Sequence, residues 1–313
     1  MRAVKLLCVL IGLSLWVASC AAAAEEGVSL AYKFTEGGKL AYDVTFSGAG
    51  KLTSPDAQTS PLVIQGSASV SQTVAKVEAD GSAVLETVLP RADITAAVGD
   101  KKARFTWADG AMRWYLDGQE RTPPSADLSK APGLSSPIRV TMKPDGSVTD
   151  ISFSDAQIMD MLRKLAPGMA SSMPTPSTMP TFPADPVKVG ESWTKTGDLP
   201  LGEGQTLTYN TRRTLESLTS KGGVDLAKIS GYGEVKYRGS TQAITGPDGK
   251  QLTFSIAEMK ETVTSTEFFN VGAGRMVRGD YELVVSVKVS AGVGGANQSG
   301  SAELRLRATV VGR

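Results

Sequence analysis

The chain has 313 residues, with 33 Lys and Arg against 32 Asp and Glu, so its net charge is close to zero. This balance, without a basic run, argues against a nucleic-acid binder, because phosphate contacts need clustered Lys and Arg. Histidine is absent, and the only cysteines are Cys8 and Cys20. Ser-His and Cys-His catalysis, His-ligated zinc or haem, and disulfides beyond residue 20 are therefore excluded. We expect a protein that is not an enzyme and that has no cofactor and no metal.

The first 20 residues have the pattern of an export signal. Arg2 and Lys5 precede an apolar stretch of 12 residues, Leu6–Val17. This stretch is too short for a bilayer span, which needs about 20 residues, but it is typical of a signal peptide. Val17-Ala18-Ser19-Cys20 follows and resembles the bacterial lipobox, in which the cysteine thiol receives the lipid. The sequence thus predicts a signal peptide at residues 1–19 and lipidation at Cys20.

The predicted location is the bacterial cell envelope, with the protein anchored to a membrane through the lipid on Cys20. The alternative is cleavage near Ala24, within the run Ala21-Ala22-Ala23-Ala24, which would discard Cys20. The product would then be a soluble periplasmic or secreted protein.

From residue 28 onward the dominant period in hydrophobicity is two, which is typical of strands with one face on a core and the other in water. Buried parallel strands have continuous apolar runs instead, so this alternation indicates antiparallel sheets. Asp109-Gly110 and Pro144-Asp145-Gly146 are tight-turn sequences between such segments. The clearest alternating positions are Leu40, Tyr42, Val44 and Phe46, then Tyr281, Leu283, Val285, Val287 and Val289, and then Ala302, Leu304, Leu306, Ala308 and Val310.

One segment, residues 155–166, has helical periodicity. Ser154 and Gln157 form a capping box before it, and Pro167-Gly168 ends it. The residues that follow are rich in Pro and Met, as in a semi-rigid linker. The predicted fold is mainly β, with two antiparallel curved-sheet or half-barrel domains and one helix. The predicted bounds are 28–166 for the first β-rich domain with its helix, 167–186 for the linker, and 187–313 for the second domain.

The two halves share a spaced pattern that favours duplication of one unit. Phe34-x-x-Gly37-x-x-Leu40 corresponds to Val187-x-x-Gly190-x-x-Trp193. The segment from Val74 to Leu85 corresponds, without a gap, to the segment from Leu215 to Leu226. The alternative is that unrelated β proteins reuse such combinations of glycine turns and apolar positions.

The phrase Tyr32-Lys33-Phe34-x-x-Gly37-x-x-Leu40-x-Tyr42 resembles the opening of an uncharacterised group of exported bacterial proteins. Members of that group carry a later phrase similar to Val189-Gly190-Glu191-Ser192-Trp193. The resemblance covers most of residues 30 to 290 and rests on strand and turn residues. It implies an exported β-rich protein and brings no catalytic residues.

Two groups of side chains are candidates for a ligand site. Five of the 10 methionines fall between Met159 and Met179, and flexible thioethers suit uneven apolar contacts better than a copper site without histidine. Two tryptophans fall in one predicted hairpin and suit the wall of a pocket, although a plug in the core is the alternative. The candidate ligand-binding residues are Met159, Leu162, Met169, Met173, Trp107 and Trp114.

A curved sheet covered by one helix leaves a concave apolar face that can admit a lipid-like ligand. The sequence therefore favours a non-enzymatic envelope protein that binds an apolar or amphiphilic ligand. The alternative is a structural or assembly protein of the envelope that contacts other envelope proteins and has no small-molecule ligand.

Overall fold

The computed structural model describes residues 27–54, 57–108, 110–121, 137–153, 180–202, 205–238, 241–245, 251–293 and 296–313. Most of these residues lie in strands, and the described part of the chain contains no α-helix. The strands in chain order are β1 (Lys39–Thr53), β2 (Thr59–Val77), β3 (Ala83–Val98), β4 (Lys101–Ala108), β5 (Ala111–Leu116), β6 (Gln119–Arg121), β7 (Ile138–Met142), β8 (Val148–Phe153), β9 (Ser192–Gly202), β10 (Gln205–Lys221), β11 (Val224–Arg238), β12 (Thr241–Thr245), β13 (Gln251–Asn270), β14 (Arg275–Val293) and β15 (Ala296–Gly312).

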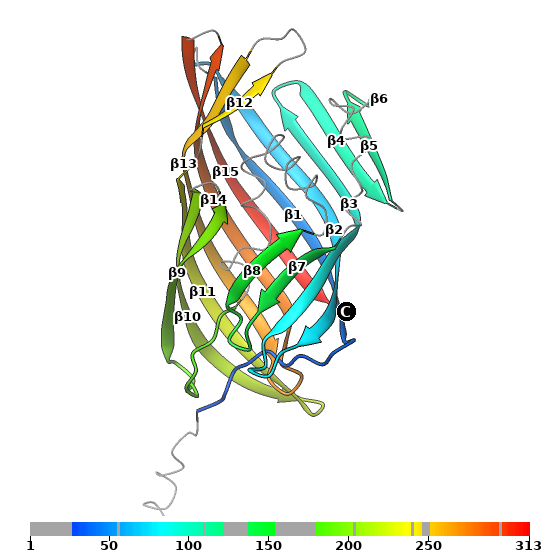
Figure 1. The fold of residues 1–313 in the computed structure, drawn as a ribbon, viewed down its shortest axis with the longest axis vertical. Coiled ribbons are helices and arrows are strands. Elements are labelled where there is room, and N and C mark those ends of the chain that lie inside the picture. The colour runs from blue at the N-terminus through cyan, green and yellow to red at the C-terminus, as the bar shows by residue number, and fades with distance from the viewer. Residues whose placement is uncertain are drawn as a thin grey trace, which may run out of the picture.

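All 15 strands belong to one sheet, in the order β6-β5-β4-β3-β2-β1-β15-β14-β13-β11-β10-β9. The strand β12 adds to β13, and β7 lies between β3 and β8. Neighbouring strands are antiparallel, as the alternation predicts. Figure 1 shows that the sheet is strongly curved and brings the β7–β8 hairpin in front of β1 and β15. Within the described residues β8 and β9 do not pair, so the sheet is not closed.

The prediction of two separate β domains is wrong for the described residues. Strand β1 from the first half pairs with β15 from Tyr42↔Gly312 to Thr53↔Ser301, so the halves share one continuous ladder. An isolated bridge also joins Val28 to Val187. Alternation shows which side chains share a face of a strand, but it says nothing about which strand lies alongside.

The predicted helix at 155–166 lies outside the described residues, as does most of the predicted linker. The end of that linker differs from the expectation. Phe182 is only 1% exposed, and its backbone N–H donates to the carbonyl of Asp145. Residues 180–186 are therefore tied to the main core rather than spacing two domains.

The main core lies at the end of the sheet where the N-terminal segment crosses it, at the bottom of Figure 1. Tyr32 of this segment contacts the rings of Phe182 and Phe269, with centroids 5.4 and 5.3 Å away. Its backbone N–H donates to the carbonyl of Pro144, and that of Lys33 donates to Gly274. Side chains from both halves of the chain thus fill one core.

The turns at Gly37 and Gly190 make matching hydrogen bonds. Both glycines have positive φ, 76° and 88°. The Gly37 N–H donates to the carbonyl of Val74, and the Gly190 N–H donates to that of Leu215. Gly37 corresponds to Gly190, and Val74 to Leu215, in the spaced pattern of the sequence. The correspondence concerns turns within one sheet, and it does not divide the chain into two domains.

Candidate functional site

The concave face of the sheet is an apolar wall. Residues directly opposite each other in an antiparallel pair point to the same side, so the register carries one face across the strands. One such row runs from Trp114 through Phe105, Ile94, Gly66, Phe46 and Ala308 to Tyr281. A second row runs from Ile64 through Gly48, Leu306 and Leu283 to Val263.

From β1 across β15 to β14, the side chains of this wall are mostly half-buried. The side chains of the main core, in contrast, are fully buried. The opposite, convex face carries polar and charged side chains such as Ser47, Arg305 and Arg307, which are exposed. The described residues thus leave accessible apolar surface on the side of the sheet that curves inward. Apolar surface that stays in contact with solvent is where an apolar ligand gains most by binding.

Glu261 places a carboxyl among the apolar side chains of this wall. It lies on β13 opposite Val235 of β11 and Val285 of β14, and the side chain is 6% exposed. The neighbours two positions away on its own strand are Met259 and Val263. No hydrogen bond or ion pair joins its carboxyl to another residue of the described part of the chain. Burial raises its pKa from the usual 4.5 to about 7.

A second buried acid on the same strand has the opposite environment. Glu267 is fully buried, and its Oε2 accepts a hydrogen bond of 3.2 Å from the Nε of Arg213. Its Oε1 accepts from the hydroxyl of Ser265, while Arg213 also donates to the hydroxyl of Thr181. This carboxylate has the partners that a buried charge requires, so it belongs to the core and not to a ligand site.

Side chains bridge the unpaired edges of β8 and β9. Lys195 of β9 donates to Asp145, at the turn between β7 and β8, over 2.9 Å. Burial of Asp145 raises its pKa, but the hydrogen bonds from Lys195 and Ser147 more than offset this, so the net pKa lies below the usual range. Beside this pair, the indole Nε1 of Trp193 donates to the carbonyl of Thr181 at 2.6 Å. Side-chain contacts, and not a ladder of backbone hydrogen bonds, therefore hold β9 near the β7–β8 hairpin.

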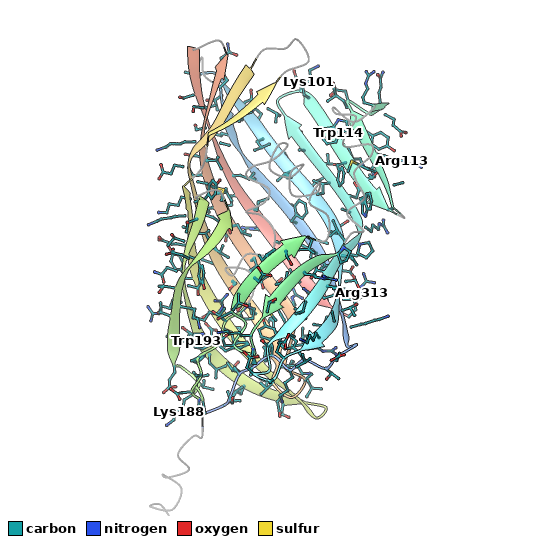
Figure 2. The ribbon with its side chains drawn as sticks, in the orientation of Figure 1. Lys101, Arg113, Trp114, Lys188, Trp193 and Arg313 are labelled. Atoms are coloured by element: carbon teal, nitrogen blue, oxygen red, sulfur yellow. The ribbon has the colours of Figure 1, made fainter. Side chains whose placement is uncertain are left out.

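The two predicted tryptophans share the concave face but differ in exposure. Trp107 lies opposite Met112, and Trp114 lies opposite Phe105, so the predicted common face is present. Trp107 is 2% exposed, and its Nε1 donates to the carbonyl of Leu89, as in a core plug. Trp114 is half-buried and lies far across the sheet from Trp193 (Figure 2). Trp114 is thus the tryptophan of the pair that a ligand can reach.

The other predicted site residues, namely Met159, Leu162, Met169, Met173 and Cys20, lie outside the described residues. Within the described ranges, no group of three or more His, Cys, Asp or Glu side chains is placed to hold a metal ion. In the same ranges, no helix is long and apolar enough to cross a membrane.

Glu261 was missed at the level of sequence, although a signal for it exists. On β13 it has the same alternation phase as Met259, Val263 and Phe269, which all point inward. Glu267 shares this phase, so alternation finds both acids. The side-chain contacts show that Arg213 pairs with Glu267, and the register shows that apolar residues face Glu261.

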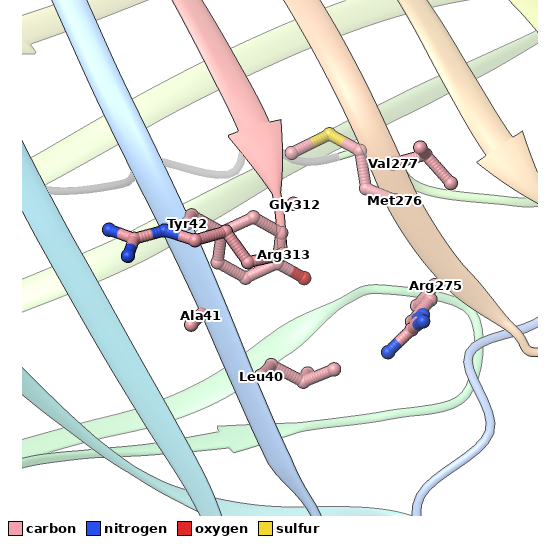
Figure 3. A pocket seen from close by; sticks show the side chains of 8 residues that line it. All are labelled: Leu40, Ala41, Tyr42, Arg275, Met276, Val277, Gly312 and Arg313. Carbon is pink, nitrogen blue, oxygen red and sulfur yellow. The ribbon is translucent and has the colours of Figure 1, made fainter.

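Two hollows on the surface are unsuitable for an apolar ligand. The first has a volume of about 40 Å³ and lies beside Tyr42, Arg275 and Arg313 (Figure 3). Tyr42 is itself buried, which raises the pKa of its hydroxyl to about 12. Ligand pockets usually measure about 300 to 1,000 Å³, so this one is far too small. The second measures about 520 Å³ and is lined largely by polar convex-face residues, with an ion pair between Arg104 and Asp93.

Comparisons with known proteins add little. No protein-family model matches the chain, and no curated protein matches it. Among solved structures, an outer membrane channel from Pseudomonas putida F1 is 8% identical with a TM-score of 0.23, covering 93% of this chain and 98% of that one. OpdQ of Pseudomonas aeruginosa is 8% identical with a TM-score of 0.20, covering 88% of this chain and 99% of that one. Similarity at this level carries no information about the function of the chain.

Proposed function

We propose that this protein is an exported, non-enzymatic binding protein that holds an apolar or amphiphilic ligand against its concave face. One observation carries the proposal, namely the continuous apolar wall whose side chains remain half-buried from β1 to β14. A filled core would bury these side chains as fully as Phe269 or Leu85, which are 0% and 1% exposed. The sheet curves around this wall, so a ligand on it would contact several strands (Figure 1).

The proposal includes anchoring through a lipid on Cys20, with the binding wall in the cell envelope. The leader and the lipobox-like residues 17–20 support this part. The alternative, an assembly protein, would use exposed apolar residues of the convex face. Val63 and Val284 are 47% and 40% exposed, but Arg305 lies between them in the row that joins β2 to β14. Such scattered apolar residues are ordinary on a protein surface, so we favour ligand binding.

A fluorescence titration with N-phenyl-1-naphthylamine, a neutral apolar probe, tests the wall directly. We expect Leu306→Gln, which places an amide on the concave face, to weaken probe binding about tenfold, because a buried amide without partners costs roughly 1–3 kcal/mol. The matched control is Arg307→Gln, the next residue on β15, whose side chain lies on the convex face.

The two variants separate the outcomes. Equal probe affinity in both variants and the wild type would remove the concave wall as the site. If the wild-type protein binds no probe and instead assembles with itself or with envelope proteins, the assembly alternative takes its place. If the wild-type protein binds the probe and Leu306→Gln weakens the binding, native mass spectrometry of the protein purified from its own host would identify any ligand retained on the wall.

A further inference from the structure

Glu261 has a chemical need that the described residues around it do not meet. The nearest side chains on its face are Val235, Val285, Met259 and Val263, and all are apolar. An ionised carboxylate in apolar surroundings is strongly disfavoured unless a cation or hydrogen-bond donors accompany it. Glu267, three same-face positions farther along β13, shows what this fold does for a structural acid, because Arg213 and Ser265 both donate to it.

The residues of β11 and β14 that face Glu261 carry no charge. On β14 the facing residues are Leu283, Val285 and Val287, and none of them is charged. On β11 the titratable side chain is Tyr237, which lies opposite Met259, and beyond it Tyr209 of β10 lies opposite Val235. The wall cations Lys195 and Arg213 are engaged with Asp145 and Glu267. No cation of these strands is therefore available to Glu261.

The position of Glu261 suits the head of an amphiphile. Its row continues through Val285 to Leu304 and Gly50, toward the half-buried part of the wall. An aliphatic chain lying on that part would bring one end of the molecule to the carboxyl. A cationic group at this end would supply the missing counter-charge.

We propose that Glu261 is the specificity-determining residue of the wall and that the ligand is a cationic amphiphile, whose ammonium group pairs with this carboxyl. The inference rests on the proposed function, because it assumes that the wall binds an aliphatic chain. It adds the chemical class of the ligand and the residue that selects it.

The test compares dodecyltrimethylammonium with dodecanol by isothermal titration calorimetry, with both below their micellar or solubility limits at pH 8. The chains are of equal length, so the comparison isolates the charge. We expect the wild-type protein to bind the ammonium compound about tenfold more tightly than dodecanol, since a charge pair near a protein surface can supply that factor. In Glu261→Gln the two affinities should become equal while dodecanol binding persists.

Glu258→Gln is the matched control. Glu258 lies on the same strand, is exposed, and pairs with Lys288 on the convex side over 3.0 Å. This variant makes the same chemical change and removes the same charge, so it should keep the wild-type preference. Loss of the preference in both variants would show a general charge effect and would overturn the proposal.

A measurement on the wild-type protein keeps the proposal testable if Glu261→Gln does not fold. The trimethylammonium group does not titrate, so any change with pH comes from the protein. Because burial raises the pKa of Glu261 to about 7, its carboxyl is neutral at pH 5 and charged at pH 8. The preference for the ammonium compound should therefore fall at least about fivefold from pH 8 to pH 5.

The outcomes distinguish the two proposals. If dodecanol binds but the ammonium compound has no advantage, or if dodecanoate binds best, the assignment of Glu261 is wrong and the proposed function stands. If neither dodecanol nor the ammonium compound binds the wild-type protein, the proposed function itself fails.

Discussion

Two acids on β13 show how local surroundings decide the role of a residue. Glu261 and Glu267 have the same chemistry and the same alternation phase, and both are buried. The guanidinium of Arg213 accompanies Glu267, whereas apolar side chains surround Glu261. A buried charge needs such partners, because the loss of one of them leaves the other uncompensated. A buried charge without them costs stability, which a protein tolerates where the group has a function.

The raised pKa of Glu261 makes a prediction about stability. An acid whose pKa rises from 4.5 to about 7 on folding holds its proton more tightly in the folded chain. The stability that this tighter proton binding gives the folded chain is therefore fully present below pH 4.5. It is lost as the pH rises from there through about 7. The loss amounts to roughly 3 kcal/mol when the whole shift is realised. Glu261→Gln removes the titrating group, so this variant should not show the loss of stability with rising pH.

Urea denaturation at pH 5 and pH 8 measures this effect. The wild-type protein should lose more stability between these pH values than Glu261→Gln does, and the difference reports Glu261 alone. Glu258→Gln should behave like the wild type, because Glu258 is exposed. Identical pH dependence in all three proteins would mean that the carboxyl of Glu261 is hydrated or paired in solution.

At the scale of elements, the bend of the sheet depends on glycines of the concave face. A Cβ on Gly50 of β1 would collide with the carbonyl oxygen of Glu303 and lie 2.8 Å from the Cα of Leu304. A Cβ on Gly48 would lie 2.5 Å from the carbonyl oxygen of Arg305. The backbones of β1 and β15 approach so closely here that only glycine fits, and such positions allow a sheet to curve tightly.

Gly50→Ala should therefore destabilise the protein by about 2 kcal/mol or more, because the obstructing atoms belong to the backbone and cannot rotate away. Gly272→Ala is the control, since a Cβ there would meet only the side-chain oxygen of Asn270 at 3.5 Å. Thermal denaturation of both variants gives the comparison. Equal melting temperatures would show that β1 and β15 are farther apart at Gly50 than the structure places them.

At the scale of the whole molecule, the proposed lipid anchor and the concave wall together define the proposed role. A lipid on Cys20 would keep the protein at a membrane, where amphiphiles are concentrated. Acyl chains contribute about 0.8 kcal/mol per buried methylene, so several of them on one cysteine give stable anchoring. The wall would then capture its ligand close to the source.

Cys20→Ser tests the anchor. We expect the wild-type protein to sediment with membranes and the variant to remain in the soluble fraction, because serine cannot accept the thioether-linked lipid. Intact mass gives a second readout, with the wild-type mature chain starting at Cys20 and carrying acyl groups. A mature mass that starts at residue 25 and contains no lipid would contradict the lipoprotein proposal and support cleavage near Ala24.

The sequence by itself determined the fold class and the strand faces. Alternation in residues 40–46, 281–289 and 302–310 predicts β1, β14 and β15 correctly, because the period of two follows from the geometry of a single strand. Turn sequences such as Pro144-Asp145-Gly146 also follow from local backbone preference, and this one lies between β7 and β8 as expected. Composition likewise excluded histidine chemistry, and cysteine chemistry beyond residue 20, without any structure.

Only the tertiary structure decided how the strands associate. The pairing of β1 with β15 brings together residues 248 to 270 positions apart, from Thr53↔Ser301 to Tyr42↔Gly312, and no local pattern encodes such a partner. That pairing turned two expected domains into one curved sheet. The pairing of β13 with β11 and β14 placed Val235 and Val285 on either side of Glu261, and the packing of β10 placed Arg213 beside Glu267. The site depends on neighbours across strands, which are set by the packing of the whole chain and not by the order of residues along it.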